Sequence, residues 1–412
     1  MKILMVNKFL YPKGGAELYM FKLGNQLKAL GNMVEYFGMQ DEKNIVGNNA
    51  NSYAPNIDYH KQNKKRVKLA LSTIHSRESC RQIAEVLDTF SPDVVHLNNI
   101  NFQITPAIIY EIGKRNIPVV QTVHDVQIAC PCHRFYIDHK QQICEECNGG
   151  KYWKCVKNKC LQNSFLKSIV AAIESYYYHT RKTYNMVDMY ICPSKFITQQ
   201  IIRAGIDEKK AVIMQNFGDD TIAEIIKEKS PKYVLYFGRL SHEKGIKTLL
   251  DVFKNNNDID IKIAGSGPLE EEVKRVANSN SNITYIGFKT GSELRKIIQN
   301  AQFSLCTSEW HENSPLSILE SEALGTPVVT SELGGLKELV EEGETGRVFK
   351  AGDKEQLTLV VRQLWEDEAA IKQMSENCLK KKLYKISTYA EDILNQYKKV
   401  IQMKERSNRN VK

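Results

Sequence analysis

The feature that most constrains the fold of this chain is a strand–glycine–helix pattern that occurs near the start of each half. Residues 2–7 form an apolar run, a loop with Gly14 and Gly15 follows, and an apolar helical face then ends at Gly31. The pattern begins again with the apolar run 233–237, which leads directly into a second glycine loop. Strands that alternate with helices predict parallel sheets, because each helix carries the chain back across a sheet face.

The recurrence of this pattern predicts an α/β protein with two doubly wound, Rossmann-like domains. A chain of 412 residues is long enough to give each domain its own hydrophobic core. We place the first domain at 1–216 and the second at 217–387, because the polar run that ends at Pro231 is typical of a linker.

Polar side chains follow two of the strands predicted in the first half. One strand delivers His96, Asn98 and Asn99, and the next delivers His124 and Asp125. Ligands of open parallel sheets bind at the carboxyl ends of the strands, so these residues indicate a binding edge. A lone histidine is more often structural than functional, and the residues alone leave that alternative open.

The segment 309–330 contains a helix start that suits an anion. Ser314 is a predicted N-cap, and Pro315 fits the first helical turn, where its missing N–H costs nothing. The free N–H groups of a helix N-terminus favour a phosphate. Glu312 and Glu320 bracket this start, and carboxylates beside a phosphate site can accept hydrogen bonds from sugar hydroxyls. Taken alone, the segment also fits a surface helix with scattered glutamates.

Two further loops follow strands of the second half. Gly238, Arg239 and Lys244 lie between a predicted strand and a helix, and two cations at this spacing can clamp a diphosphate without a metal. Gly265 and Gly267 form a second loop beside a strand end. The alternatives are a pair of surface cations and an ordinary tight turn.

Three of these segments together resemble the family-4 retaining glycosyltransferases of the GT-B fold. They are the Glu312-x7-Glu320 spacing with its tail ALGTPVV (323–329), the loop GRLSHEKG (238–245) and the segment TVHD (122–125). The resemblance covers essentially the whole chain. It implies two Rossmann-like domains that face a cleft, with a terminal helix at about 388–404 that packs back on the first domain.

The resemblance also implies roles for individual residues. Arg239 and Lys244 would bind the diphosphate, Glu320 the ribose, and Glu312 and His124 the donor sugar. Our predicted catalytic residues are His124, Arg239, Lys244 and Glu312. The predicted donor-binding residues are Gly14, Gly15, Gly238, Arg239, Lys244, Gly265, Gly267, Phe288, Asn313, Ser314, Pro315, Leu316 and Glu320.

The activity that the resemblance implies is transfer of a sugar from a UDP- or GDP-linked donor to a glycan or lipid-linked acceptor, in cell-surface polysaccharide synthesis. No side chain is placed as a nucleophile, so we expect same-face attack, and no cofactor is expected for catalysis. One departure is Asn98-Asn99, where many relatives carry His-Asn, so no acceptor role is carried over to it. A sugar-nucleotide epimerase of the same fold is the alternative.

Six of the ten cysteines fall between residues 130 and 160. Clustered cysteines in a chain of this class indicate metal or redox chemistry before disulfides. The spacing C-x2-C-x7-C-x4-C fits a closed, structural zinc site on a loop-rich insertion. The predicted ligands are Cys144, Cys147, Cys155 and Cys160. Cys130 and Cys132 are alternative ligands, and the other interpretation is a set of free or redox-labile thiols.

The net charge of +9 lies entirely in residues 1–200, which hold 25 Lys and Arg against 16 Asp and Glu. This excess predicts an anionic partner on one side of the protein. No apolar run is long enough to span a bilayer, so we expect a cytoplasmic protein. The basic run 61–68 and the amphipathic segment 163–183 suit the inner membrane surface. We expect no nucleic-acid partner, although the cysteines keep a zinc-containing nucleic-acid-binding protein as an alternative.

Overall fold

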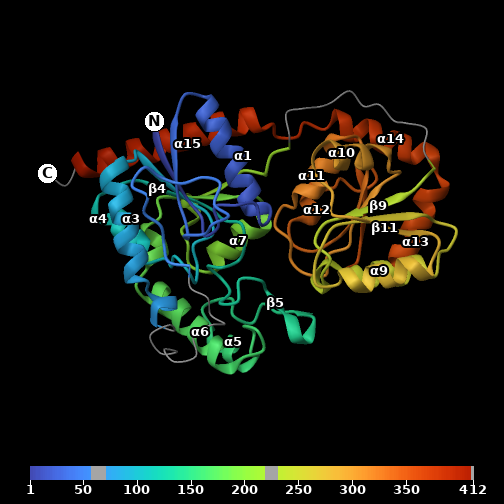
Figure 1. Cartoon of the computed structure of the whole chain (residues 1–412), viewed down its shortest axis with the longest axis horizontal. Helices are drawn as coiled ribbons and strands as arrows, with labels where there is room; N and C mark the ends of the chain where they lie inside the picture. The colour runs from blue at the N-terminus through green and yellow to red at the C-terminus, as the bar shows by residue number, and fades with distance from the viewer. Residues whose placement is uncertain (57–70, 219–230, 410–412) are drawn as a thin grey trace. The chain divides into compact units, whose positions relative to one another are not determined.

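The apolar runs predicted as strands form two separate six-stranded sheets, each parallel throughout (Figure 1). The computed structural model describes residues 1–56, 71–218 and 231–409. The chain divides into two compact units, one of Met1–His139, Cys144–Gln215 and Ile386–Lys412 and the other of Asn216–Lys385 with Lys140–Ile143. Two parallel α/β sheets confirm the predicted fold class.

The sheet of the first unit has the order β2-β1-β3-β4-β7-β8. Its four central strands are buried along almost their whole length, which is why their sequences are nearly continuous apolar runs instead of alternating ones. The strands are β1 (Lys2–Val6), β2 (Met33–Phe37), β3 (Val94–Leu97), β4 (Val119–Thr122), β7 (Met189–Cys192) and β8 (Ala211–Ile213).

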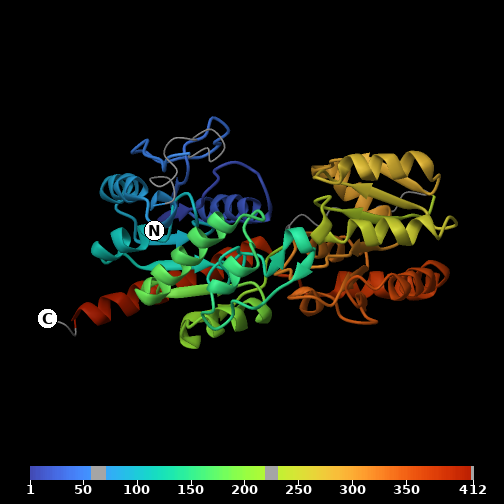
Figure 2. The ribbon, with the colours of Figure 1, turned by 90° about the horizontal axis from the view of Figure 1, so that it is seen from below.

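Helices cover both faces of this sheet, as Figures 1 and 2 show. They are α1 (Gly15–Ala29), α3 (Arg77–Phe90), α4 (Ile108–Lys114), α6 (Phe165–Thr180), α7 (Lys195–Arg203) and α15 (Ile386–Arg409). The cysteine-rich insertion between β4 and α6 carries the short strands β5 (Tyr136–Ile137) and β6 (Gln142–Ile143) and the helix α5 (Trp153–Lys157). The predicted basic run 61–68 lies outside the described residues.

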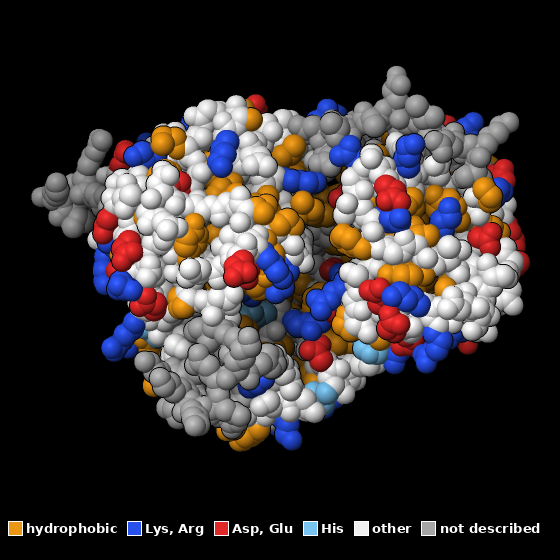
Figure 3. All heavy atoms as spheres, viewed as in Figure 1, with side chains coloured by type: hydrophobic (Ala, Val, Ile, Leu, Met, Phe, Trp, Pro, Cys, Tyr) orange, Lys and Arg blue, Asp and Glu red, His pale blue; other side chains and the backbone are white. Residues whose placement is uncertain are grey.

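The sheet of the second unit has the order β11-β10-β9-β12-β13-β14. Its strands are β9 (Val234–Phe237), β10 (Ile261–Ala264), β11 (Ile283–Gly287), β12 (Ser304–Cys306), β13 (Val328–Ser331) and β14 (Gly346–Phe349). Its helices are α8 (Ile246–Lys254), α9 (Glu270–Ser279), α10 (Gly291–Asn300), α11 (Leu316–Ala323), α12 (Leu336–Leu339), α13 (Lys354–Glu366) and α14 (Glu368–Lys380). Acidic and basic side chains are interspersed over its visible face (Figure 3), in line with the balanced charge of residues 201–412.

The helix α15 belongs to the first unit, although the second unit precedes it in the chain. It packs against α1 and β4, and two of its tyrosines enter the buried polar interior of that unit. The hydroxyl of Tyr389 lies 2.8 Å from that of Tyr19, and the hydroxyl of Tyr397 lies 2.5 Å from Nδ1 of His96. These contacts add to those that Tyr19 and His96 make with Oγ1 of Thr122, at 3.1 and 2.7 Å. The buried polar groups are thus hydrogen-bonded.

Within the described part of the chain, no helix is long and apolar enough to cross a membrane.

Candidate functional site

The predicted diphosphate loop joins β9 to α8 in the second unit. Arg239 is exposed on this loop, and among the described residues it has no carboxylate partner. Lys244 ends a short 3-10 helix (His242–Lys244) at the other end of the loop. The loop is anchored by backbone hydrogen bonds, among them one from the N–H of Leu240 to the carbonyl of Ser266 (2.9 Å). The loop therefore carries an exposed arginine near one end and Lys244 near the other.

The two glycine loops of the second unit approach each other backbone to backbone. A Cβ added at Gly265 would lie 1.9 Å from the carbonyl oxygen of Gly238, and one at Gly267 would lie 2.4 Å from that of Leu240. Both glycines have positive φ values, 146° and 157°, which other residues rarely adopt. Glycine is therefore required for the packing of the two loops, whatever role the loops have toward a ligand.

Glu312 is buried and forms an ion pair with Lys244. The same oxygen, Oε1, accepts hydrogen bonds from Oγ of Ser308 and Nε1 of Trp310, each at 2.7 Å. Burial opposes the charge of both partners, yet the pKa of Glu312 is lowered by the ammonium and the pKa of Lys244 is raised by the carboxylate. Both groups are therefore charged at neutral pH. The alternative of a solvent-exposed glutamate at position 312 is wrong.

Sequence reasoning missed Ser308 and Trp310. Both follow β12, and a polar residue directly after a buried strand is the signal that could have identified Ser308. The backbone of Glu312 is held as well, because its carbonyl accepts a hydrogen bond from the N–H of Gly335 at 2.8 Å. Both the side chain and the backbone of Glu312 are thus held in place.

The start of α11 differs from the prediction. Pro315 is the N-cap and the helix begins at Leu316, so Ser314 does not cap it. The extended backbone of Pro315, with ψ at 130°, moves the helix start one residue later and takes the Ser314 side chain out of reach of the first-turn N–H groups. Oγ of Ser314 is consequently buried without a hydrogen-bond partner in the described structure.

The other predicted donor-binding residues of the second unit lie at loop positions or on the first turns of α11. Glu320 is half-buried on α11, and Asn313 and Leu316 are half-buried as well. Phe288 follows β11 and is 70% exposed, so its backbone and ring are accessible. The structure brings Lys244 and Glu312 into contact, and the roles of the other residues toward a donor stay predictions.

In the first unit, Gly14 is the N-cap of α1 and Gly15 begins the helix. His124 follows β4, and its Nε2 lies 2.8 Å from Oδ1 of Asn98, so Nε2 carries the proton that is donated. Burial lowers the pKa of His124 to about 3, so the ring is neutral at physiological pH. Asn98, which departs from the family pattern, is thus the residue that orients this histidine.

Asp125 follows His124 but caps the next turn of the chain. Its Oδ1 accepts a hydrogen bond from the N–H of Gln127 at 2.9 Å. Burial raises the pKa of Asp125 to about 6. The first-unit strand ends therefore present a neutral imidazole and a carboxyl group that titrates near neutral pH.

Four cysteines of the insertion contact one another in series. The sulfurs of Cys130 and Cys132 are 3.4 Å apart, Cys132 also contacts Cys160, and Cys160 contacts Cys155. All ten cysteines are free, and burial raises the pKa of the Cys147 thiol. Among the residues that the structure describes, no three His, Cys, Asp or Glu side chains are arranged so that they could share a metal ion. The thiols as placed here do not form a metal site.

Two glycosyltransferase family models match this chain, and together they cover residues 13–381. A model described as Glycosyltransferase Family 4 matches residues 13–221, and one described as Glycosyl transferases group 1 matches residues 219–381. An uncharacterized glycosyltransferase of Methanocaldococcus jannaschii is 26% identical over 211 residues, which is 50% of this chain and 57% of that protein. The chain spans about half the length of the curated relatives it matches.

Solved structures share the fold across nearly the whole chain. A sucrose-phosphate synthase from Thermosynechococcus elongatus has a TM-score of 0.70 at 17% identity, covering 98% of this chain and 99% of that one. An Anabaena protein solved in complex with UDP has a TM-score of 0.68 at 16% identity, covering 97% and 100%. Both are similar to this chain in fold.

Proposed function

Because the chain belongs to glycosyltransferase family 4, we propose that it is a retaining glycosyltransferase that uses a nucleotide-sugar donor. The observation that carries the proposal is the buried ion pair of Glu312 with Lys244, a lysine on the loop that also carries Arg239. Fixed positive charge at this edge suits a departing diphosphate, since preorganised charges stabilise the charge that develops in a transition state. The UDP complex of the similar Anabaena fold supports a uridine nucleotide as donor.

In this proposal the chain's residues act by position and charge. Arg239, Lys244 and the N-terminus of α11 neutralise the leaving diphosphate, and Glu320 holds the ribose. The family resemblance assigns Glu312 and His124 to the donor sugar. No side chain serves as a nucleophile. The acceptor oxygen attacks the anomeric carbon from the face that the departing diphosphate vacates, its proton passes to that diphosphate, and the configuration is retained. Product analysis with and without acceptor separates this transferase from an epimerase.

Replacing Arg239 by alanine should weaken binding of UDP about 10- to 100-fold, because one charge-assisted contact is lost. Calorimetry measures the affinity. Arg275→Gln, on α9, is the matched control, since it removes an exposed cation of the same unit and should leave UDP affinity unchanged. Equal affinity of wild type and Arg239→Ala would remove Arg239 from the diphosphate site.

We further propose a lipid-linked or growing glycan as acceptor, in cell-surface polysaccharide synthesis, with the first unit resting on an anionic membrane. The helix α6 supports this, because Phe165, Leu166 and Ile173 are 53%, 69% and 49% exposed, and Trp153 on the neighbouring α5 is 52% exposed. Large apolar side chains beside an excess of basic residues are typical of a membrane-surface helix.

Wild-type protein should sediment with anionic vesicles, less as salt rises, since each basic residue near such a surface contributes about 1 kcal/mol. Leu166→Asp/Ile173→Asp should reduce the bound fraction severalfold. Leu359→Asp, at an equally exposed leucine of α13, should not. A bound fraction that changes neither with the charge of the lipid nor with these substitutions would argue against membrane association.

We also propose a structural zinc in the insertion, bound by Cys144, Cys147, Cys155 and Cys160, with Cys130 and Cys132 as alternative ligands. The proposal requires the contacting thiols of Cys155 and Cys160 to turn toward a shared metal ion. Protein purified without chelator should contain about one zinc per chain. Cys155→Ser/Cys160→Ser should lose it, whereas Cys378→Ser, a buried thiol of α14, should keep it. Folded wild-type protein without zinc would assign these cysteines as free thiols.

A further inference from the structure

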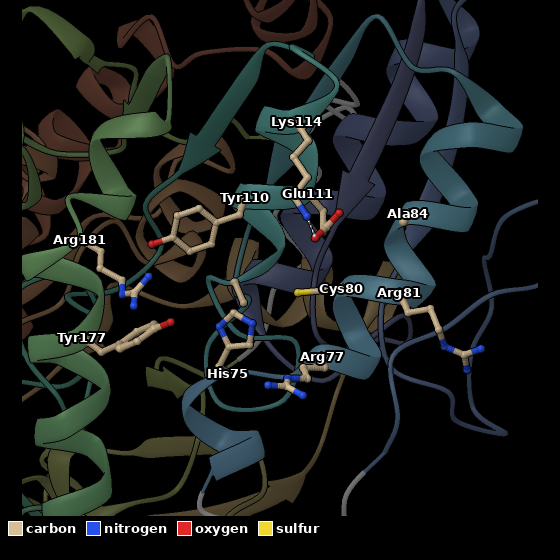
Figure 4. A pocket seen from close by; sticks show the side chains of 11 residues that line it. His75, Arg77, Cys80, Arg81, Ala84, Tyr110, Glu111, Lys114, Tyr177 and Arg181 are labelled. Carbon is tan, nitrogen blue, oxygen red and sulfur yellow. Dashed lines mark hydrogen bonds and ion pairs between the residues drawn. The ribbon is translucent and has the colours of Figure 1, made fainter.

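The first unit contains a pocket that none of the predicted donor residues lines. It has a volume of about 430 Å³ and lies in the groove between α3 and α4, with the end of α6 as its third wall (Figure 4). Its floor is small and apolar, formed by Cys80, Ala84 and Ala107. The pocket is therefore a cavity on the helical layer of this unit, separate from the loops that follow its strands.

Basic side chains dominate the walls of this α3–α4 pocket. Four cations line it against a single carboxylate, Glu111, which pairs with Lys114 at 2.6 Å. Arg81 is also paired, with Glu78 outside the pocket. Arg77 and Arg181 have no carboxylate partner among the residues that the structure describes. Of the described residues, these two guanidinium groups thus line the pocket without a carboxylate partner, one at the start of α3 and one just after the end of α6.

His75 adds an unused polar atom between these two arginines. Its Nδ1 is buried and has no hydrogen-bond partner in the described part of the chain. The ring lines the pocket and stands edge-on to Tyr177, with ring centroids 6.1 Å apart. Burial, and after it the charges of Arg77 and Arg181, lower the pKa of His75. A neutral imidazole can donate one hydrogen bond here, and a buried donor without an acceptor costs stability.

The N-terminus of α3 adds a third source of positive potential to the α3–α4 pocket. The fourteen-residue helix α3 begins at Arg77, so its N-terminus is at the pocket, with Ser76 as the N-cap. An anion with several acceptor oxygens would suit all three features of the pocket. These are the two guanidinium groups, the histidine nitrogen and the helix N-terminus. A phosphate is such an anion, since it accepts from guanidinium groups in pairs.

We propose that the α3–α4 pocket binds a phosphate-bearing group, with Arg77 and Arg181 as its charge partners and His75 as a hydrogen-bond donor. The apolar floor and the rings of Tyr110 and Tyr177 leave room for a small organic group on the phosphate, such as glycerol. Tyr177 is on α6 and Arg181 is its C-cap, and the exposed apolar residues of this helix lie about one to three turns before Tyr177. A lipid headgroup and a free phosphate ester therefore offer the same chemistry. The proposal does not depend on the glycosyltransferase activity.

The test uses Arg77→Gln/Arg181→Gln in the full chain, in an Arg239→Ala background that weakens any phosphate binding at the predicted diphosphate loop. The matched control is Arg203→Gln/Lys209→Gln, which removes two exposed cations of the same unit outside the pocket. Glycerol 3-phosphate and inorganic phosphate are titrated by calorimetry. Sedimentation is measured with phosphatidylcholine vesicles with and without phosphatidic acid. Melting temperature without ligand checks that each variant is folded.

We expect the pocket variant to bind glycerol 3-phosphate at least about 10-fold more weakly than the control, because each arginine contributes a charge-assisted contact. His75→Phe, which keeps an aromatic ring at this position and removes the N–H donor, should weaken binding of glycerol 3-phosphate as well. Loss of sedimentation confined to phosphatidic acid vesicles would identify a headgroup as the source of the phosphate, and loss confined to the soluble esters would identify a free metabolite. Failure of the control protein to bind any of the three probes, or equal binding by the pocket variant, would overturn the proposal.

Discussion

Replacing Lys244 by methionine should lower the free energy of unfolding by about 3–5 kcal/mol, because it leaves the buried Glu312 carboxylate without its cation. Methionine keeps most of the apolar stem of the side chain, so the loss reports the charge and little of the packing. Ser308 and Trp310 still donate to Glu312, but two neutral donors do not replace a full positive charge. Urea denaturation of the full chain measures the change.

The double variant Lys244→Met/Glu312→Gln should recover most of that stability, because the unpaired charge is then gone. It should not recover affinity for UDP, since the proposed phosphate ligand is still missing. Lys354→Met is the control, because its pair with Asp251 on the surface has both partners exposed and should be worth about 1 kcal/mol or less. If Lys244→Met and Lys354→Met cost the same, the buried pair is not a significant source of stability.

Glu312→Gln and Glu320→Gln should fail in different ways. Glutamine at position 312 keeps an oxygen that accepts from Lys244, Ser308 and Trp310, so affinity for UDP should be nearly unchanged. Turnover at saturating donor should fall about 100- to 1,000-fold, since a fixed negative charge beside the sugar stabilises the positive charge that develops on it.

Glu320→Gln should instead weaken binding of UDP and of UDP-sugar alike, about 10-fold, because a ribose contact serves both ligands. Calorimetry with UDP and a transfer assay at saturating donor separate the two effects. Full turnover in Glu312→Gln would contradict our assignment of Glu312. A loss of UDP affinity in Glu312→Gln as large as that in Glu320→Gln would contradict it too, and would indicate that this carboxylate acts only by positioning Lys244.

The strands and glycine loops could be predicted because their signals are local. A buried parallel strand is a continuous apolar run, and Gly265 and Gly267 lie where two backbones meet, so each is visible within a few residues. The helix start at α11 is also local, yet it was placed one residue early, because the extended backbone before a helix suits Pro315 as well as Ser314.

The remaining features depend on contacts that no spacing reveals. Lys244 and Glu312 are 68 positions apart, and the sequence presented them as separate ligands of one substrate instead of partners of each other. The His124–Asn98 contact joins two strand ends, and Asn98 had been set aside because it departs from the family pattern. The cysteine spacing identified the cluster but not the contacts within it, since pairing depends on how the insertion folds.

The return of α15 to the first unit sets an order for folding during synthesis. The core of that unit includes Tyr389, Ile393 and Tyr397, which the ribosome releases only after all of the second unit. Until α15 is made, Tyr19 and His96 of the first unit lack the tyrosine partners that this helix supplies, while the second unit can already form its own sheet. In this chain the unit that begins first is the one that finishes last, so a translational stop near residue 385 would leave a complete second unit joined to an unfinished first one.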